Sequence, residues 1–217
     1  MTNPMNSARL VLVLALVALT GCFSLSRDEP VQQHYVLGGD RTPERRATPD
    51  SLAGLSIALR RLDLADYLNN PLIVVRQGPQ QIKFSESQRW GENPVEGITR
   101  TVASYLLSRA PLGAVDTAPW PRGVVYNYTV QLHIMQFEGV ATESVGPEGT
   151  LEGTAGEARL LATWEILGPR SVLERGTTDF RERWDVGNYA SLVELLDTGL
   201  SELADDLVTG LAKIVTP

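Results

Sequence analysis

The sequence predicts one α/β or α+β domain, in which a mixed β-sheet packs against two main helices. Several segments alternate apolar and polar residues with a period of two, which is typical of strands. Two longer segments carry apolar residues three or four positions apart, which is typical of amphipathic helices. These elements follow the order strands, helix, long strands, helix, with no internal repeat and no second domain boundary.

The first 21 residues have the features of a secretory signal peptide. Arg9 precedes an apolar run from Leu10 to Leu19, and no other charged side chain occurs before Arg27. The run is too short to cross a bilayer core of about 30 Å, which needs roughly 20 residues. Because a positive residue, a short apolar stretch and small residues are typical of a signal peptide, we exclude residues 1–21 from the fold.

Cys22 directly follows this segment and is the only cysteine in the chain. Together with Leu19, Thr20 and Gly21 it resembles the lipobox of bacterial lipoproteins. We therefore expect signal peptidase recognition at Leu19, Thr20 and Gly21, and lipidation of Cys22 with palmitate among the acyl chains. The alternative is a buried free cysteine at the end of a core segment. Because each buried CH₂ contributes about 0.8 kcal/mol, several acyl chains would anchor the protein firmly in a membrane.

The composition excludes several classes of function. The chain carries 19 basic and 26 acidic side chains, for a net charge of −7. This acidic balance argues against nucleic acid as a partner, since phosphate neutralisation supplies most of that affinity. A single cysteine also excludes an intramolecular disulfide. Phe23 follows Cys22, where aspartate favours retention in the inner membrane, so we expect an anchor on the periplasmic face of the outer membrane.

The chain divides into three expected parts. Residues 1–21 are the signal peptide, residues 22–53 the lipidated N-terminus and tether, and residues 54–217 the folded domain. The tether is poor in periodic apolar residues, although residues 34–37 predict one short strand. As a coil of about 30 residues, the tether would let the domain reach a partner well away from the membrane.

Three short strands are predicted in the first part of the domain. They cover residues 55–60, 72–76 and 81–85, which alternate in polarity or are rich in β-branched residues. Residues 65–71 predict a turn or a single helical turn that ends at proline. Since the connections are short, we expect the three strands to form a small sheet together.

The second part of the domain contains both helices and the longer strands. A helix is predicted from Pro94, a residue favoured in a first helical turn, to just before Pro111. The long strands predicted after this helix cover residues 126–134, 158–166 and 172–180. A Gly- and Glu-rich loop is expected at residues 139–156, and a last helix over residues 188–214. The apolar stripe of that helix consists of Leu192, Leu196, Leu200, Leu203, Leu207, Leu211 and Ile214.

The chain offers few groups for catalysis or metal binding. Its two histidines, His34 and His133, lie in separate segments, and no His-Glu-x-x-His spacing occurs. The glycines of residues 139–156 lack the Lys-Ser/Thr ending of a phosphate-binding loop. We therefore expect no enzyme activity, metal or cofactor. Four tryptophans could line a groove for an apolar ligand, although packing roles are favoured; they are Trp90, Trp120, Trp164 and Trp184.

Two stretches before the first helix carry a recognisable pattern. Residues 66–76 read DYLNNPLIVVR, and residues 84–94 read FSESQRWGENP. Together with the leucine-rich C-terminal helix, they resemble the ABC-type transport auxiliary lipoproteins, a family that includes paraquat-inducible protein C and its YmbA-like relatives. Asn70 and Gly91 depart from the basic residue and the alanine expected at those positions.

The resemblance implies a non-enzymatic accessory component of an MCE-type lipid transport system that supports membrane integrity. Its partners would be an MCE-domain protein and the ABC transporter or permease of the same system, and homo-oligomers occur in the family. The resemblance also implies an anticodon-binding-domain-like architecture. Arg76, Arg89 and Trp90 are the candidate interface residues, since Arg and Trp are enriched at binding hot spots. The alternative is that Arg89 and Trp90 brace the turn into the helix at Pro94.

Two further functions stay open at this point. One is a lipoprotein that itself binds lipid or another apolar ligand, and the other is a structural lipoprotein of envelope assembly. A periplasmic hydrolase is disfavoured because the two histidines are isolated.

Overall fold

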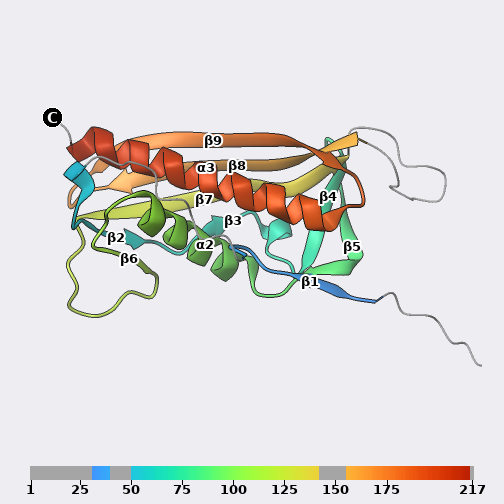
Figure 1. Cartoon of the computed structure of the whole chain (residues 1–217), viewed down its shortest axis with the longest axis horizontal. Helices are drawn as coiled ribbons and strands as arrows, with labels where there is room; N and C mark the ends of the chain where they lie inside the picture. The colour runs from blue at the N-terminus through green and yellow to red at the C-terminus, as the bar shows by residue number, and fades with distance from the viewer. Residues whose placement is uncertain (1–30, 40–49, 142–154, 216–217) are drawn as a thin grey trace, which may run out of the picture. The chain divides into compact units, whose positions relative to one another are not determined.

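A computed structural model describes residues 31–39, 50–141 and 155–215 of the chain. The expected signal peptide, the lipobox and most of the 139–156 loop lie outside these ranges. In the described part, nine strands form one mixed sheet, and the helices α2 (Pro94–Arg109) and α3 (Tyr189–Val215) pack with it (Figure 1). The prediction of a single domain with a mixed sheet and two main helices is confirmed, and the class is α+β.

Three long antiparallel strands form the regular part of the sheet, which we call the meander. They are β7 (Tyr128–Ala141), β8 (Ala155–Leu167) and β9 (Val172–Asp185), and β8 pairs along its length with both neighbours. Figure 1 shows α3 running along these strands. Because one face meets the helix and the other faces solvent, β8 alternates strictly in burial. Its inward residues are Gly156, Ala158, Leu160, Ala162, Trp164 and Ile166.

The other edge of β7 is covered by short strands, which we call the segmented side. β2 (Ser56–Leu59), β3 (Asp63–Leu64) and β4 (Leu72–Gly78) pair in parallel with successive stretches of β7. The 3₁₀ turn η2 (Asp66–Leu68) separates β3 from β4. The chain therefore follows β7 in three pieces on this side.

Three more strands extend the segmented side outward. β6 (Ala114–Thr117) pairs in parallel with β2. β5 (Gln81–Trp90) forms an antiparallel hairpin with β4, and β1 (Gln33–Tyr35) pairs in parallel with β5. Both β1 and β6 thus lie on the side of β7 that is opposite β8 and β9.

The hydrophobic core lies between the sheet and the two helices. Asn93 caps α2, since its side chain accepts a hydrogen bond from the backbone N–H of Val95 at 2.9 Å, and Pro94 occupies the first turn. The predicted leucine stripe of α3 is buried except at its last position. The fully buried helix residues include Ile98, Val102, Leu106, Leu192, Leu196, Leu200, Leu203, Leu207 and Leu211.

Residues before the expected boundary at residue 54 also contribute to the fold. Strand β1 pairs with β5, and Leu37, two residues after it, is buried. The backbone N–H of Gly38 donates to the buried Asp197 carboxylate on α3 at 2.9 Å. Leu52, in the 3₁₀ turn η1 (Asp50–Leu52), is fully buried. The folded part therefore begins at or before β1.

Most predicted elements are confirmed, with differences at their ends and in their pairing. β5 and β9 are longer than predicted, because mostly polar residues continue each strand past its apolar alternation. β7 is also longer, because it continues past Ile134 after a register shift that interrupts the alternation. β2 does not pair with β4, contrary to the expected three-stranded sheet, because both pair with the long apolar β7. Gly139 and Gly156 lie in strands and not in the expected loop. The Trp184 ring packs there and leaves little room for a Cβ at either position.

Candidate functional site

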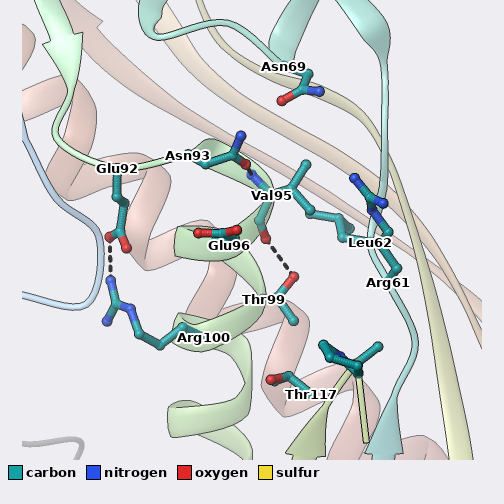
Figure 2. Close-up of a pocket in the computed structure, with 12 residues that line it drawn as sticks. Arg61, Leu62, Asn69, Glu92, Asn93, Val95, Glu96, Thr99, Arg100 and Thr117 are labelled. Carbon is teal, nitrogen blue, oxygen red and sulfur yellow. Dashed lines mark hydrogen bonds and ion pairs between the residues drawn. The ribbon is translucent and has the colours of Figure 1, made fainter.

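A cleft of about 750 Å³ opens beside the N-terminal half of α2 (Figure 2). Its walls come from α2, from the link between β2 and β3, from the end of β6 and from the residue after η2. It is lined by Arg61, Leu62, Asn69, Glu92, Asn93, Val95, Glu96, Thr99, Arg100, Thr117, Ala118 and Pro119. The cleft therefore belongs to the segmented side of the sheet and not to the meander.

The break between β2 and β3 places a cation on one wall of the cleft. Leu59 and Leu62 are both buried, so the short link between them leaves Arg61 exposed. Figure 2 shows Arg61 across the cleft from the first turns of α2, where Glu96 projects. Neither Arg61 nor Glu96 forms an ion pair with another residue in the described ranges. Both charges are thus free to meet an occupant.

Glu92 and Arg100 form the second pair of charges in the cleft. One Arg100 nitrogen lies 2.5 Å from a Glu92 carboxylate oxygen and also donates to the carbonyl oxygen of Leu37 at 3.2 Å. Arg100 therefore ties the cleft to the segment that follows β1. Within α2, the Thr99 hydroxyl donates to the Val95 carbonyl at 2.6 Å, so its polarity is satisfied locally.

These groups suit recognition of a polar surface of mixed charge. The lining includes two basic side chains, two acidic side chains and the amides of Asn69 and Asn93. No histidine or cysteine is among the residues that line the cleft. The lining therefore offers hydrogen bonds and charges, but no nucleophile paired with an imidazole base.

A smaller and more apolar hollow of about 330 Å³ adjoins the cleft. It is lined by Arg60, Arg61, Ala118, Pro119, Trp120 and Gln131, three of which also line the cleft. The Trp120 indole N–H donates to the Leu59 carbonyl at 2.9 Å, and the ring packs against Tyr126 with centroids 5.8 Å apart. The ring is nevertheless 38% exposed. Trp120 differs in this from the other three tryptophans, which are buried as the sequence favoured.

The structure places Arg76, a predicted interface residue, in a partly buried network. Its guanidinium donates to the Glu138 carboxylate at 2.6 Å and to the Tyr67 hydroxyl at 3.2 Å. The bond to Glu138 raises the pKa of Arg76. Burial and the Glu138 charge raise the pKa of Tyr67 to about 12, against the lowering effect of Arg76. The network joins β4 of the segmented side to β7.

Trp90 and Arg89, the other predicted interface residues, lie at the far end of β5. The Trp90 ring is buried and stacks on Phe137, with centroids 5.8 Å apart and planes 28° from parallel. Arg89 is opposite Leu72 in the hairpin, whereas Arg76 is opposite Ile82. The three residues therefore do not form one patch in the described structure, and their interface role stays a prediction.

The histidines also lie apart. His34 is in β1, whereas His133 is in β7, with its Nδ1 2.9 Å from an Asp63 carboxylate oxygen. In the described ranges, no group of three or more His, Cys, Asp or Glu side chains could hold a metal ion. No described helix combines the length and apolar character needed to cross a membrane.

The cleft is not evident from the sequence. Its charged residues belong to segments 30 or more positions apart that meet only through the pairing of β2, β3 and β6 with their neighbours. The available signals were indirect. Asn93-Pro94 marks a helix start, and Arg60-Arg61 interrupts two apolar stretches.

Comparison with known proteins identifies the family. The family model described as "ABC-type transport auxiliary lipoprotein component" matches residues 35–208. A crystal structure of a DUF330 protein from Xanthomonas campestris is similar, with a TM-score of 0.67 and 16% identity over 84% of this chain and 95% of that one. A crystal structure of an uncharacterised protein has a TM-score of 0.58 and 15% identity, over 84% of this chain and 99% of that one. These two likenesses support the fold.

No curated protein matches the chain. The family match covers the cleft, both helices up to residue 208 and all strands from β2 to β9. It agrees with the resemblance carried by residues 66–76 and 84–94. The chain is a member of the ABC-type transport auxiliary lipoprotein component family.

Proposed function

We propose that this protein is a non-enzymatic accessory component of an MCE- and ABC-type lipid transport system. In this proposal, Cys22 carries the lipid that anchors the protein to the periplasmic face of the outer membrane. Family membership supports an auxiliary role in ABC-type transport. The lipobox at residues 19–22 and the phenylalanine after it support the anchor and its membrane.

The observation that carries the docking role is the cleft beside α2. All twelve residues that line it fall inside the family match, and its walls hold unpaired charges of both signs. Such walls suit a polar segment of a protein partner, because charge complementarity gives specificity at an interface. The proposed partner in the cleft is the MCE-domain protein or the permease of the system.

The alternative, in which the protein itself binds lipid, is less well supported. An acyl chain needs a sheltered apolar space, because ligand pockets are mostly apolar with few polar groups. The cleft has charged walls, and the space between the sheet and the helices is filled by leucine, isoleucine and tryptophan side chains. The cleft therefore favours a polar partner over an acyl chain.

Site-specific photocrosslinking in cells tests the docking role. A crosslinking amino acid replaces Glu96 in the cleft of the full chain, and a matched variant carries it at the exposed Thr177 of β9. We expect the Glu96 position to capture an MCE-domain protein or a permease and the Thr177 position to capture neither. Capture of lipid alone at Glu96 would support the alternative, and equal capture at both positions would contradict docking in the cleft.

The anchor is tested separately. We expect metabolic labelling with a palmitate analogue to mark the wild-type protein, and Cys22→Ala to lose the label. Separation of the inner and outer membranes on a density gradient then places the labelled protein. A wild-type chain without label contradicts the anchor, and label in the inner membrane contradicts only the proposed location. Native mass spectrometry of the acylated protein tests the homo-oligomer that the family resemblance implies.

A further inference from the structure

The loop between β6 and β7 exposes apolar side chains close together in the chain. Trp120, Val124 and Val125 are 38%, 45% and 88% exposed, and every residue from 118 to 125 is exposed. The other exposed large apolar side chains of the described residues are Val31 and Val36, which flank β1, and one each on β5, α2, β7 and β9, namely Phe84, Leu107, Met135 and Leu173. An exposed apolar cluster marks an interaction site more often than scattered single residues do.

The base of this loop is held firmly, so the apolar tip is presented in a defined position. Asn127 and Ser56 exchange two hydrogen bonds, of 2.8 and 2.9 Å, where the loop enters β7. The Tyr126 hydroxyl donates to the Asp116 carboxylate at 2.8 Å. The Trp120 indole is fixed by its bond to the Leu59 carbonyl. The exposure of the tip is thus a property of an ordered loop.

Three arginines lie in the loop or beside its Trp120 ring. Arg122 is in the loop, and Arg60 and Arg61 line the hollow that contains the Trp120 ring. All three side chains are exposed, and none forms an ion pair with another residue in the described ranges. In a chain with a net charge of −7, this is a local concentration of positive charge. Its chemistry complements an anionic surface.

The loop and the N-terminal strand β1 lie beyond the same edge of β7, the one opposite β8 and β9, but at opposite ends of that strand. Figure 1 shows both of them below the meander. The chain between Cys22 and β1 comprises residues 22–32. Even fully extended, these residues span at most about 40 Å, so an anchor at Cys22 keeps the domain close to the bilayer.

We infer that the loop from Pro119 to Val125 is a second membrane contact. Trp120, Val124 and Val125 enter the interfacial region of the bilayer, and Arg60 and Arg122 lie against anionic headgroups. Tryptophan is enriched at this depth of membranes, and basic residues around an apolar patch strengthen binding to anionic lipid. The inference rests on the proposed function, since the acylated Cys22 brings the domain to the surface. The contact also fixes the orientation of the neighbouring cleft relative to the membrane.

A fluorescent label on the loop tests this contact in the acylated full chain. Because Cys22 is the only cysteine and its thiol is acylated, Val125→Cys provides a single reactive thiol for the environment-sensitive dye NBD. The protein is reconstituted into vesicles of phosphatidylcholine with phosphatidylglycerol. The reference sample is the same labelled protein kept soluble by a carrier in buffer without vesicles or detergent. On the vesicles we expect NBD emission about twofold brighter and at shorter wavelength, because the dye enters the bilayer interface.

Two controls give each outcome a meaning. The same dye at Thr177→Cys, on the opposite edge of the sheet, should stay in a water-like environment. Adding Arg122→Glu to Val125→Cys should reduce the response in anionic vesicles more than in pure phosphatidylcholine. A Val125 label that stays water-like on vesicle-bound, acylated protein would overturn the inference. So would a response that appears only when other envelope proteins are added. Protein that carries no acyl group and does not bind vesicles at all would instead refute the proposed anchor.

Discussion

The two edges of β7 are built in different ways. On one edge β8 pairs with β7 over more than ten residues, and β9 continues the same antiparallel pattern. On the other edge β2, β3 and β4 cover β7 in short parallel pieces. The cleft, the hollow at Trp120 and the apolar loop all lie on the second side. The comparison indicates that the meander supplies a rigid support, whereas the segmented side carries the surfaces available for binding.

The difference follows from how each side can bury apolar residues. The meander offers α3 a continuous face. The leucine stripe of this 27-residue helix packs along that face. The segmented side is interrupted by Arg60-Arg61, by η2 and by Pro71, each of which ends a short strand or keeps the next from starting. Every interruption leaves loop residues at the surface, and several of these line the cleft.

The largest expected effect comes from breaking the contact between α3 and the meander. Leu200→Ala removes a fully buried side chain from the core. It should lower the free energy of unfolding by about 3 kcal/mol, through lost burial and the cavity left behind. Chemical denaturation of the full chain measures the change. Leu107→Ala, the same substitution at a 44% exposed position of α2, is the matched control and should change stability by about 0.5 kcal/mol or less. Equal losses at the two positions would contradict the assignment of the core.

The junction between the two sides gives the next effect. Arg76→Ala leaves the fully buried Glu138 carboxylate without its cation where β4 meets β7. Loss of one partner of a buried pair costs about 3–5 kcal/mol, and we expect about 2–3 kcal/mol because Arg76 retains 17% exposure. The double variant Arg76→Met with Glu138→Leu should recover most of this loss in the same denaturation experiment.

An exposed ion pair on the meander is the control for this junction. Arg175→Ala breaks the pair with Glu165, whose atoms are 2.7 Å apart, but Arg175 is 69% exposed. Since water and salt screen such a pair, the expected loss is about 0.5 kcal/mol or less. If Arg76→Ala is no more costly than Arg175→Ala, the junction does not depend on the buried pair.

The same comparison explains what the sequence could reveal. Apolar residues that recur every two positions predict β8 well, and apolar residues that recur every three or four positions predict α3 well. Both patterns are clear because a continuous strand and a long helix repeat their burial over many residues. β3 and β6 have two and four residues, too few for a pattern to be read. The pairing of β2 and β4 with β7 depends on contacts between residues about 70 positions apart, which local patterns do not encode.

The candidate site was harder to predict than the fold for the same reason. Arg76 and Trp90 stood out in the sequence because of their residue types, yet one is bonded to Glu138 and the other is stacked on Phe137. Arg61 and Glu96 are common surface residues whose significance comes only from lining one cleft from different elements. Residue type alone therefore pointed to packing positions, and three-dimensional position identified the exposed charges.

The smallest effect concerns the acidic residues where α3 faces β9. Burial, followed by the charges of Asp206, Glu182 and Asp205, raises the pKa of Glu202 above its ordinary value of 4.5. The folded protein thus binds a proton at Glu202 more readily than the unfolded chain does. The ionised carboxylate therefore lowers the free energy of unfolding at neutral pH. This loss of stability disappears as the pH falls through the folded pKa towards 4.5. Glu202→Gln should therefore stabilise the protein at pH 7, by about 0.5 kcal/mol or less because the side chain is exposed and screened, and should have no effect near pH 3.

Denaturation at several pH values measures this difference, with Glu194→Gln, an exposed position of the same helix, as the control. A gain at pH 7 that persists at pH 3 would show that the amide acts through helix propensity or packing and not through charge. A gain that fades with acid and with added salt would show that even the meander carries a local electrostatic penalty. Because that penalty is small beside the burial of the leucine stripe, the meander tolerates it and remains the rigid support, while the unpaired charges of the segmented side stay available to a partner.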